Sequence, residues 1–325
     1  WCCPAHSVRL PPLARPMAVP MRMPMSTLRP TNPAIAFAVA AAGVGTFSLM
    51  DAAMKDLSIS VGAYNAVLWR NLAGCLIAGT LFLVTGQSWP ARENLRLHLW
   101  RSFIVAGMAV SFFWAIAVLP LAEAIGLSFI APVIALYLAA ILLGEKIGRE
   151  AILASIAGLA GVGVILYGKF SGHYSSDALW GALAVLFSAV LFAYNLILAR
   201  QQAQAAGPIE IAFFQNLLTA SVLALAAPWF LAPLVVAKVP MLLTAASLAI
   251  FSLLLMSWAY ARAEAQILIP VEYTAFVWAV LFGWIFFAEP VTLTTLIGTA
   301  LIVGGSLIAA RVKPAIVNHV EMASA

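Results

Sequence analysis

The sequence predicts an all-α integral membrane protein in which ten transmembrane helices form two inverted five-helix repeats around a central cavity. Hydrophobic residues make up 64% of the chain and charged residues only 9%, whereas about a quarter of the residues in a soluble domain are charged. The apolar stretches are long enough to cross a bilayer, which takes about 20 residues. Residues 34–165 reappear, weakly but in register, 144 positions later.

The ten spans correspond to apolar bands that are separated by short polar links. A helix is the only open-chain structure that satisfies its backbone hydrogen bonds within a bilayer, and the strict alternation typical of membrane strands is absent. We therefore predict helices over residues 34–54, 63–85, 99–119, 122–143, 151–168, 179–199, 209–232, 241–261, 265–287 and 292–310.

The repeats define the domain organisation. Trp114-Ala115 recurs as Trp258-Ala259, and Asp51 falls opposite Asn195. Each copy holds an odd number of spans, so the second copy inserts upside down, which is the geometry of alternating-access transport. The expected units are a disordered cytoplasmic leader at 1–33, which is open to being non-native sequence, a first repeat at 34–168, a linker at 169–178, a second repeat at 179–311 and a cytoplasmic tail at 312–325.

The basic residues indicate the orientation. Of the seventeen, thirteen fall on the side of the N-terminus, three on the other side, and Arg70 lies within a span. Positive charge is concentrated on the cytoplasmic side of membrane proteins, so both chain ends are expected in the cytoplasm of a multi-pass protein of the cell (inner) membrane. The basic residues form no patch interleaved with aromatic side chains, and we expect no nucleic-acid partner.

Three charged side chains are candidates for a gate or for coupling: Asp51, Arg70 and Glu123. Charge within a span is costly and therefore points to function. Asp51 falls near the outer end of the first span, Arg70 about 10 Å below the outer surface, and Glu123 at the start of the fourth span on the same side. Arg70 is expected to pair with Asp51 or Glu123; a permanent structural ion pair is an equal alternative to a gate.

The candidate cavity side chains come from both repeats. Glu272 lies about two turns into the ninth span beside Pro270, whose missing N–H loosens the helix. It is a candidate proton acceptor or partner for a substrate ammonium, and the alternative is a structural carboxyl bonded to a neighbour. Pro132 is expected to kink the fourth span. The predicted substrate-binding or cavity residues are Trp114, Asn195, Trp258, Tyr260, Glu272 and Tyr273.

The sequence offers little for an enzyme. It contains no HExxH, GxSxG or P-loop motif and no cluster of His and Cys, so we expect no catalytic residues, metal or cofactor. An intramembrane enzyme acting on a lipid or a small hydrophobic substrate is the alternative. Glu145 and Glu289 each end an apolar run, and each is expected to bond the exposed N–H groups of the helix that follows.

The run Leu121-Ala-Glu-Ala-Ile-Gly-Leu-Ser-Phe-Ile-Ala-Pro132, with Leu142-Leu-Gly-Glu-Lys146, resembles the EamA repeat of the drug/metabolite transporter superfamily. The run Gly283-Trp-Ile-Phe-Phe-Ala-Glu-Pro290, followed by the glycines from Gly298 to Gly305, resembles the partner repeat. The resemblance covers residues 34–310 and implies two inverted five-helix repeats around a cavity. It departs from the usual pattern at Phe276, which stands where a proline would match Pro132.

The resemblance also implies transport of amino acids, other metabolites or drugs across the cytoplasmic membrane. With the inverted repeats, it leads us to expect a secondary transporter, more an exporter than an importer, that works by alternating access. Its partners would be the lipid bilayer and a small-molecule substrate, either an amphipathic metabolite such as an amino acid or a drug. The sequence leaves open the substrate, the direction, proton coupling and a homodimer.

Overall fold

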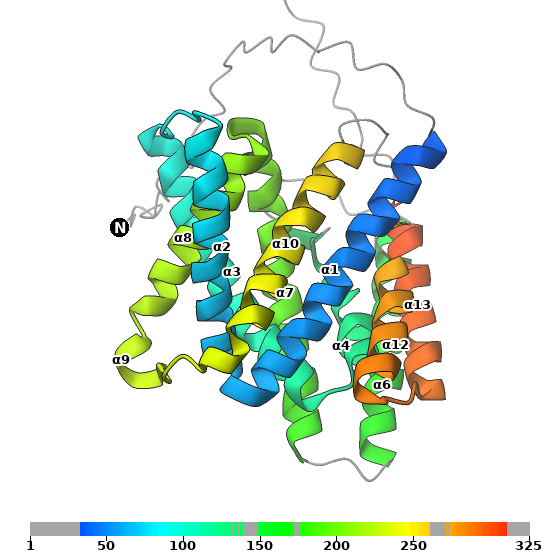
Figure 1. The fold of residues 1–325 in the computed structure, drawn as a ribbon. Helices are drawn as coiled ribbons and strands as arrows, with labels where there is room; N and C mark the ends of the chain where they lie inside the picture. The colour runs from blue at the N-terminus through cyan, green and yellow to red at the C-terminus, as the bar shows by residue number, and fades with distance from the viewer. Residues whose placement is uncertain are drawn as a thin grey trace, which may run out of the picture.

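The computed structural model describes residues 33–131, 133–135, 137–138, 149–171, 176–260, 271 and 273–310, and every regular element in this part of the chain is a helix (Figure 1). The helices are α1 Pro33–Val61, α2 Ala63–Val84, α3 Arg92–Val118, α4 Leu121–Ser128, α6 Arg149–Ser171, α7 Ser176–Ala205, α8 Pro208–Ala224, α9 Ala227–Phe230, the 3₁₀ turn η1 Val236–Lys238, α10 Val239–Tyr260, α12 Thr274–Phe287 and α13 Leu293–Ala310.

Five helices, α1, α2, α3, α7 and α10, are long and apolar enough to cross a membrane. α6, α8, α12 and α13 contribute shorter apolar stretches. The bundle exposes large apolar side chains such as Leu76, Leu83 and Trp284. An apolar surface of this extent would drive aggregation in water, whereas lipid solvates it. The described part of the chain therefore confirms an all-helical fold with membrane-capable helices.

Some helices end where the apolar bands do not predict. α1 continues to Val61, seven residues beyond the predicted end, and stops at Gly62, whose φ of 82° favours glycine. α4 ends at Ser128, and the chain resumes helical structure at Ala131. Pro132 lies outside the described residues, so its role as a kink stays a prediction; a proline obstructs the carbonyl four residues before it, which here is Ser128.

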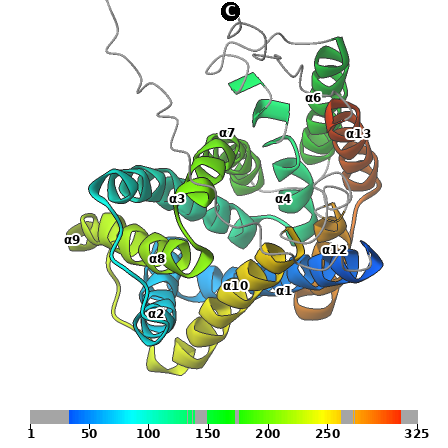
Figure 2. The same cartoon turned by 90° about the horizontal axis from the view of Figure 1, so that it is seen from above.

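The helices pack in pairs that follow the repeat. α1 lies along α10, α3 along α7, α2 along α8, and α6 along α13 (Figures 1 and 2). Adding 144 to the residue numbers takes α1 to α7 and α3 to α10. The pair α1–α10 therefore corresponds to the pair α7–α3, and each of the other two pairs joins a helix to its own counterpart. Side-chain hydrogen bonds also join the helices of both exchanged pairs. Ser252 Oγ donates to the Gly43 carbonyl at 2.8 Å, and Ser188 Oγ donates to the Met108 carbonyl at 2.9 Å.

Small residues allow the closest of these approaches. A Cβ added to Gly161 of α6 would lie 2.5 Å from the carbonyl oxygen of Gly298 in α13, and one on Gly298 would lie 2.7 Å from the Gly161 carbonyl. Backbones that come this close gain dispersion energy in lipid, where the hydrophobic effect does not drive helices together. Gly161 and Gly298 therefore allow α6 and α13 to pack backbone against backbone.

The core lies where α1 meets α2, α3 and α4. Met50, Met54 and Leu57 of α1 are fully buried, and their spacing of four and three residues places them on one face of the helix. A second set on α1 has the same spacing but is polar. We call Ser48, Asp51, Lys55 and Ser58 the α1 polar stripe; each is at most 4% exposed. Buried polar groups require partners, and these partners define the site.

Candidate functional site

The first group of buried polar residues lies at the end of the bundle where α1 ends and α4 begins. We call Lys55, Glu123, Glu289 and Thr295 the Lys55 cluster. Lys55 Nζ lies 2.5 Å from Glu289 Oε1 and donates to the Leu119 carbonyl at 2.5 Å. Thr295 Oγ donates to Glu123 Oε1 at 3.2 Å. The cluster therefore joins α1 and α4 of the first repeat to α12 and α13 of the second.

Glu289 has a role that differs from the predicted one. Its Oε2 accepts the N–H of Leu121 at 2.8 Å and so caps α4, in the other repeat, instead of the helix that follows it. α13 is capped by Thr292, whose hydroxyl accepts the N–H of Thr295 at 3.1 Å. A threonine at the N-cap satisfies that N–H without help, which leaves the Glu289 carboxylate for Lys55 and α4. Glu145 lies outside the described residues.

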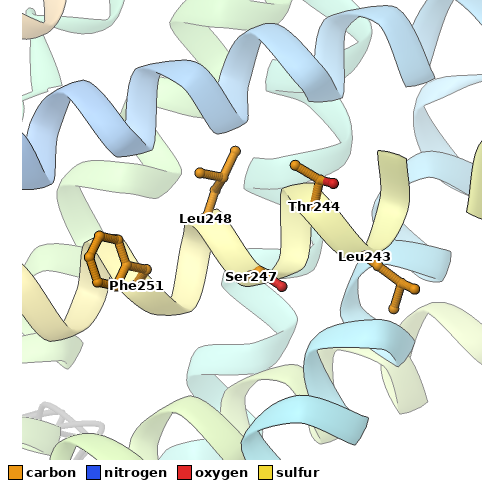
Figure 3. Close-up of a pocket in the computed structure, with 5 residues that line it drawn as sticks. All are labelled: Leu243, Thr244, Ser247, Leu248 and Phe251. Carbon is orange, nitrogen blue, oxygen red and sulfur yellow. The ribbon is translucent and has the colours of Figure 1, made fainter. Parts of the chain in front are cut away.

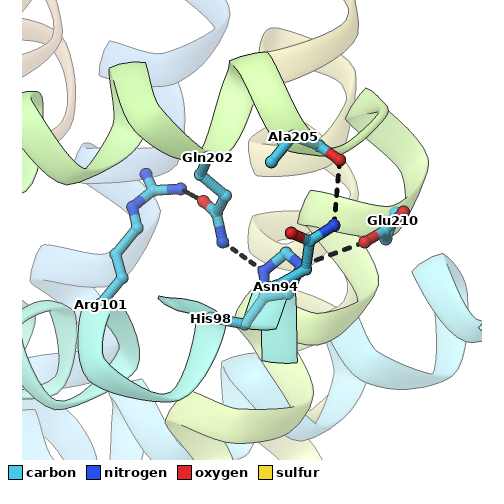
Figure 4. Close-up of polar contacts among 6 residues, drawn as sticks. All are labelled: Asn94, His98, Arg101, Gln202, Ala205 and Glu210. Carbon is cyan, nitrogen blue, oxygen red and sulfur yellow. Dashed lines mark hydrogen bonds and ion pairs between the residues drawn. The ribbon is translucent and has the colours of Figure 1, made fainter. Parts of the chain in front are cut away.

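The second group lies at the opposite end, where α3 begins, α7 ends and α8 begins (Figure 4). We call His98, Arg101, Asn195, Gln202 and Glu210 the His98 cluster. Arg101 Nε donates to Asn195 Oδ1 at 2.8 Å, and its Nη1 donates to Gln202 Oε1. Gln202 Nε2 also contacts His98 Nδ1, and His98 Nε2 lies 3.2 Å from Glu210 Oε1. His98 is fully buried.

The two clusters stand at the two ends of α3. From Arg101 to Leu119 the chain advances eighteen residues, about 27 Å at 1.5 Å per residue, close to the thickness of a bilayer's hydrocarbon core. Both clusters connect the first half of the chain with the second. Residues that hold the halves together at both ends can act as gates if the contacts at either end separate.

The predicted gate charges divide into two places. Glu123 belongs to the Lys55 cluster. Asp51 and Arg70 interact electrostatically, but among the described residues Arg70 forms an ion pair with neither Asp51 nor Glu123, which corrects the expected pairing. Instead, Arg70 Nη1 contacts the Met50 sulfur at 3.6 Å, and the guanidinium lies 5.7 Å from the centre of the Phe113 ring.

The predicted cavity residues have different surroundings. Asn195 is part of the His98 cluster. Trp114 is 42% exposed on α3, Trp258 packs against a small apolar cluster that includes Val44, and Tyr273 meets the Phe129 ring edge-on at 5.3 Å. Their role in a cavity stays a prediction. The side chain of Tyr260 is not described, and Glu272, Pro270 and Pro132 lie outside the described residues.

One hollow in the described surface lies on α10. Its lining side chains all come from this helix, beside α1 (Figure 3), so it is a shallow groove. It contains none of the predicted cavity residues. The lining residues are Leu243, Thr244, Ser247, Leu248 and Phe251.

Sequence reasoning missed Lys55, His98, Arg101 and Gln202 as site residues. Lys55 was placed on the outer side, just beyond the predicted end of the first span. The spacing of Ser48, Asp51, Lys55 and Ser58, which is three, four and three residues, was the signal that could have revealed one polar face on a longer helix. Arg101 falls at the predicted start of the third span, where the count of basic residues assigns it to the cytoplasmic side, and His98 lies one residue before that span.

An all-helical bundle with an apolar exterior and buried charges that join two halves is a multi-pass membrane protein. The chain belongs to the EamA-like transporter family, whose model matches residues 33–167 and again residues 179–311. This double match confirms the resemblance and the duplication.

The relatives are named as transporters. The chain is 28% identical to the pseudopaline exporter CntI of Pseudomonas aeruginosa, over 82% of this chain and 93% of the relative. It is 24% identical to a riboflavin transporter of Brucella anthropi, over 74% of this chain and 84% of the relative. A protein of known crystal structure aligns with a TM-score of 0.58 and 21% identity, over 85% of this chain and 95% of that one; this likeness shows the fold alone. The family and the relatives point to a small-molecule transporter.

Proposed function

We propose that this protein is a secondary transporter of the cell (inner) membrane that moves a small metabolite or drug by alternating access, mainly outward. The metabolite would be an amino acid or a similar amphipathic solute. The observation that carries the proposal is the pair of polar clusters at the two ends of α3, each of which joins the two repeats. The family match and a relative named as an exporter support it.

The proposed topology is ten helices in two inverted repeats, with both termini in the cytoplasm. The exchange of the pair α1–α10 with the pair α7–α3 supports it, because a two-fold axis in the membrane plane produces that exchange. In this orientation the Lys55 cluster lies at the outer end and the His98 cluster at the inner end.

The mechanism follows from the gates. Opening the outer end separates Lys55 from Glu289, and opening the inner end separates Arg101 from Asn195 and Gln202. Each separation exposes buried polar groups to water. Hydration of these groups offsets part of the interaction energy that is lost when the contacts break. The substrate shifts the balance between the two states only as far as it binds one of them more tightly.

The test is counterflow in vesicles that contain the full-length chain. The panel contains amino acids, nucleosides, riboflavin and cationic drugs, and mass spectrometry checks that the carried solute is unchanged. We expect at least one solute to exchange, with no flux in empty vesicles. Chemical conversion of the solute would favour the alternative, an intramembrane enzyme, and absence of exchange for the whole panel would contradict transport.

A second experiment addresses the gates. Cysteines replace Lys55 and Glu289 in one variant, and His98 and Glu210 in another, on a background with the native cysteines changed to serine. Linking either pair with a bifunctional thiol reagent should stop exchange, and cleaving the link should restore it. Exchange that continues through a linked pair would exclude that end as a gate. Imposed pH gradients and native mass spectrometry of the same preparations test proton coupling and a homodimer.

A further inference from the structure

We propose that Asp51 and Arg70 form the recognition site for a zwitterionic substrate, whose ammonium group binds Asp51 and whose carboxylate binds Arg70. The inference rests on the proposed transport function and names the substrate class. Its basis is the buried carboxyl group of Asp51 and the half-buried guanidinium of Arg70, two opposite charges that do not form an ion pair with each other.

The first step is the lack of partners. Asp51 and Ser48 are each 2% exposed. Asp51 Oδ1, Ser48 Oγ and Arg70 Nε are buried and have no hydrogen-bond partner among the residues that the structure describes. Buried polar groups without partners are uncommon in folded proteins, because each has lost its water without a replacement. The three atoms come from facing parts of α1 and α2.

The second step is the contrast with other charges in the chain. Lys55 and Glu289 approach to 2.5 Å, and Lys238 and Asp56 approach to 2.7 Å. Asp51 and Arg70 carry opposite charges and interact electrostatically, but they form no such ion pair with each other. Each charge is therefore able to accept a group from a third molecule.

The second repeat contains counterparts of Asp51 and Ser58 that have hydrogen-bond partners. Asp51 and Ser58 correspond to Asn195 and Gln202, 144 positions later. In the second repeat both amides accept hydrogen bonds from Arg101. The position that corresponds to Arg101 is Ala245, which has no side-chain donor. In the second repeat, Arg101 therefore bonds the side chain at this polar position. In the first repeat the same position holds a carboxylate, Asp51, and no residue corresponds to Arg101 as its donor.

The depth of Asp51 and Arg70 in the bundle follows from the rise of α1 and α3. Asp51 lies one helical turn from Lys55 along α1, so it is directly inside the outer cluster. Arg70 lies over Phe113, which is twelve residues, or about 18 Å, along α3 from Arg101 of the inner cluster. The two charges therefore lie between the two proposed gates, which is where alternating access requires the substrate.

The chemistry of the pair selects the ligand. A free anion would bind Arg70 but would be repelled by Asp51. A free cation would bind Asp51 but would be repelled by Arg70. Because the two protein charges cancel, the favoured ligand is neutral overall and carries both charges within a few bonds.

The experiment measures binding separately from transport. Thermal stabilisation of the detergent-solubilised full-length chain is measured with the twenty common L-amino acids, glycyl-leucine and glycine betaine. For each zwitterion that stabilises the protein, the amide or ester and, where the amine allows it, the N-acetyl derivative are compared. We expect blocking either charge to weaken binding roughly 10- to 100-fold, the range for a lost hydrogen bond between charged groups.

Variants assign the effect to the two residues. Asp51→Asn should weaken binding of the zwitterion but not of the N-acetyl derivative, an anion that Asp51 repels in the wild type. Arg70→Gln should weaken binding of the zwitterion but not of the amide, a cation that Arg70 repels in the wild type. Asp56→Asn, the same change five residues further along α1 at a surface ion pair, is the control and should bind as the wild type does. If a single variant fails to fold, the double variant, which buries no lone charge, replaces it and should lose the preference for zwitterions.

The outcomes separate the two proposals. Binding without counterflow would contradict transport and leave the recognition site standing. Counterflow in which amide and N-acetyl forms compete as well as the zwitterion would overturn the site and leave transport standing. Unchanged zwitterion affinity in the double variant, or stabilisation by none of the panel, would also overturn the site.

Discussion

Glu289→Ala should destabilise the protein more than any other single change in the Lys55 cluster. Lys55, whose side chain is 4% exposed, would lose its anion, and breaking a buried pair in this way costs about 3–5 kcal/mol. The N–H of Leu121 would lose an acceptor that lies at 2.8 Å, which costs about 1–3 kcal/mol. The Glu289 side chain is 17% exposed, so water should enter the space that the substitution leaves and hydrate the freed groups. We therefore expect the summed loss of unfolding free energy to lie at the lower end of these ranges, about 4 kcal/mol.

A double-mutant cycle isolates the ion pair from the cap. Lys55→Met removes the cation and leaves Glu289 bonded to α4, so we expect a smaller loss, about 1–3 kcal/mol. Adding Glu289→Gln to Lys55→Met should cost little more, since no unpaired charge remains. The coupling free energy should therefore reach at least about 2 kcal/mol.

The assay is reversible unfolding of the full-length chain in mixed detergent micelles. The matched control is the cycle Lys238→Met with Asp56→Asn, a more exposed ion pair for which coupling of about 0–1 kcal/mol is expected. If the Lys55 and Glu289 changes add to within about 0.5 kcal/mol, the two side chains do not stabilise each other and the reasoning is refuted.

Two further predictions concern the other end of the bundle and the helix interface. His98→Phe should preserve the ring stack on Phe214, whose centroid lies 5.4 Å away, but should leave groups of Gln202 and Glu210 without partners, at a cost of about 1–3 kcal/mol; unchanged unfolding would show that the His98 contacts contribute nothing. Gly161→Ala should lower the unfolding midpoint, because its Cβ would lie 2.5 Å from a backbone oxygen of α13 and overpacking costs about 1–3 kcal/mol. Gly163→Ala, where a Cβ meets nothing within 4 Å, is the control, and equal effects of the two changes would contradict the close approach.

Most of the fold could be predicted because lipid imposes it. An apolar band in a bilayer has one solution for its backbone, and α13 begins within one residue of its predicted start. The end of α1 and the start of α3 could not be placed in the same way. Lys55 and Asp56 mark a polar link by composition, yet α1 continues past them because Lys55 meets a carboxylate 234 residues away in the chain. A window of local sequence contains no information on that contact.

The candidate site was predicted in its residue types more than in its contacts. The cost of charge in a membrane singled out Asp51, Arg70 and Glu123, and all three are near polar groups on other helices. Their partners depend on how the helices are rotated and shifted against each other, which the apolar pattern does not determine. The Glu289 carboxylate bonds the N–H of Leu121 in the other repeat instead of the helix that follows it, because Thr292 already caps α13.

The short loop between α3 and α4 is held from both sides. Lys55 donates a hydrogen bond to the carbonyl of Leu119, Glu289 accepts one from the N–H of Leu121, and Lys55 and Glu289 form an ion pair with each other. None of the three contacts can be lost without weakening the other two. In the proposed mechanism, this end of the bundle should consequently open in a single all-or-none step, with no partly open state through which protons or ions could leak across the membrane.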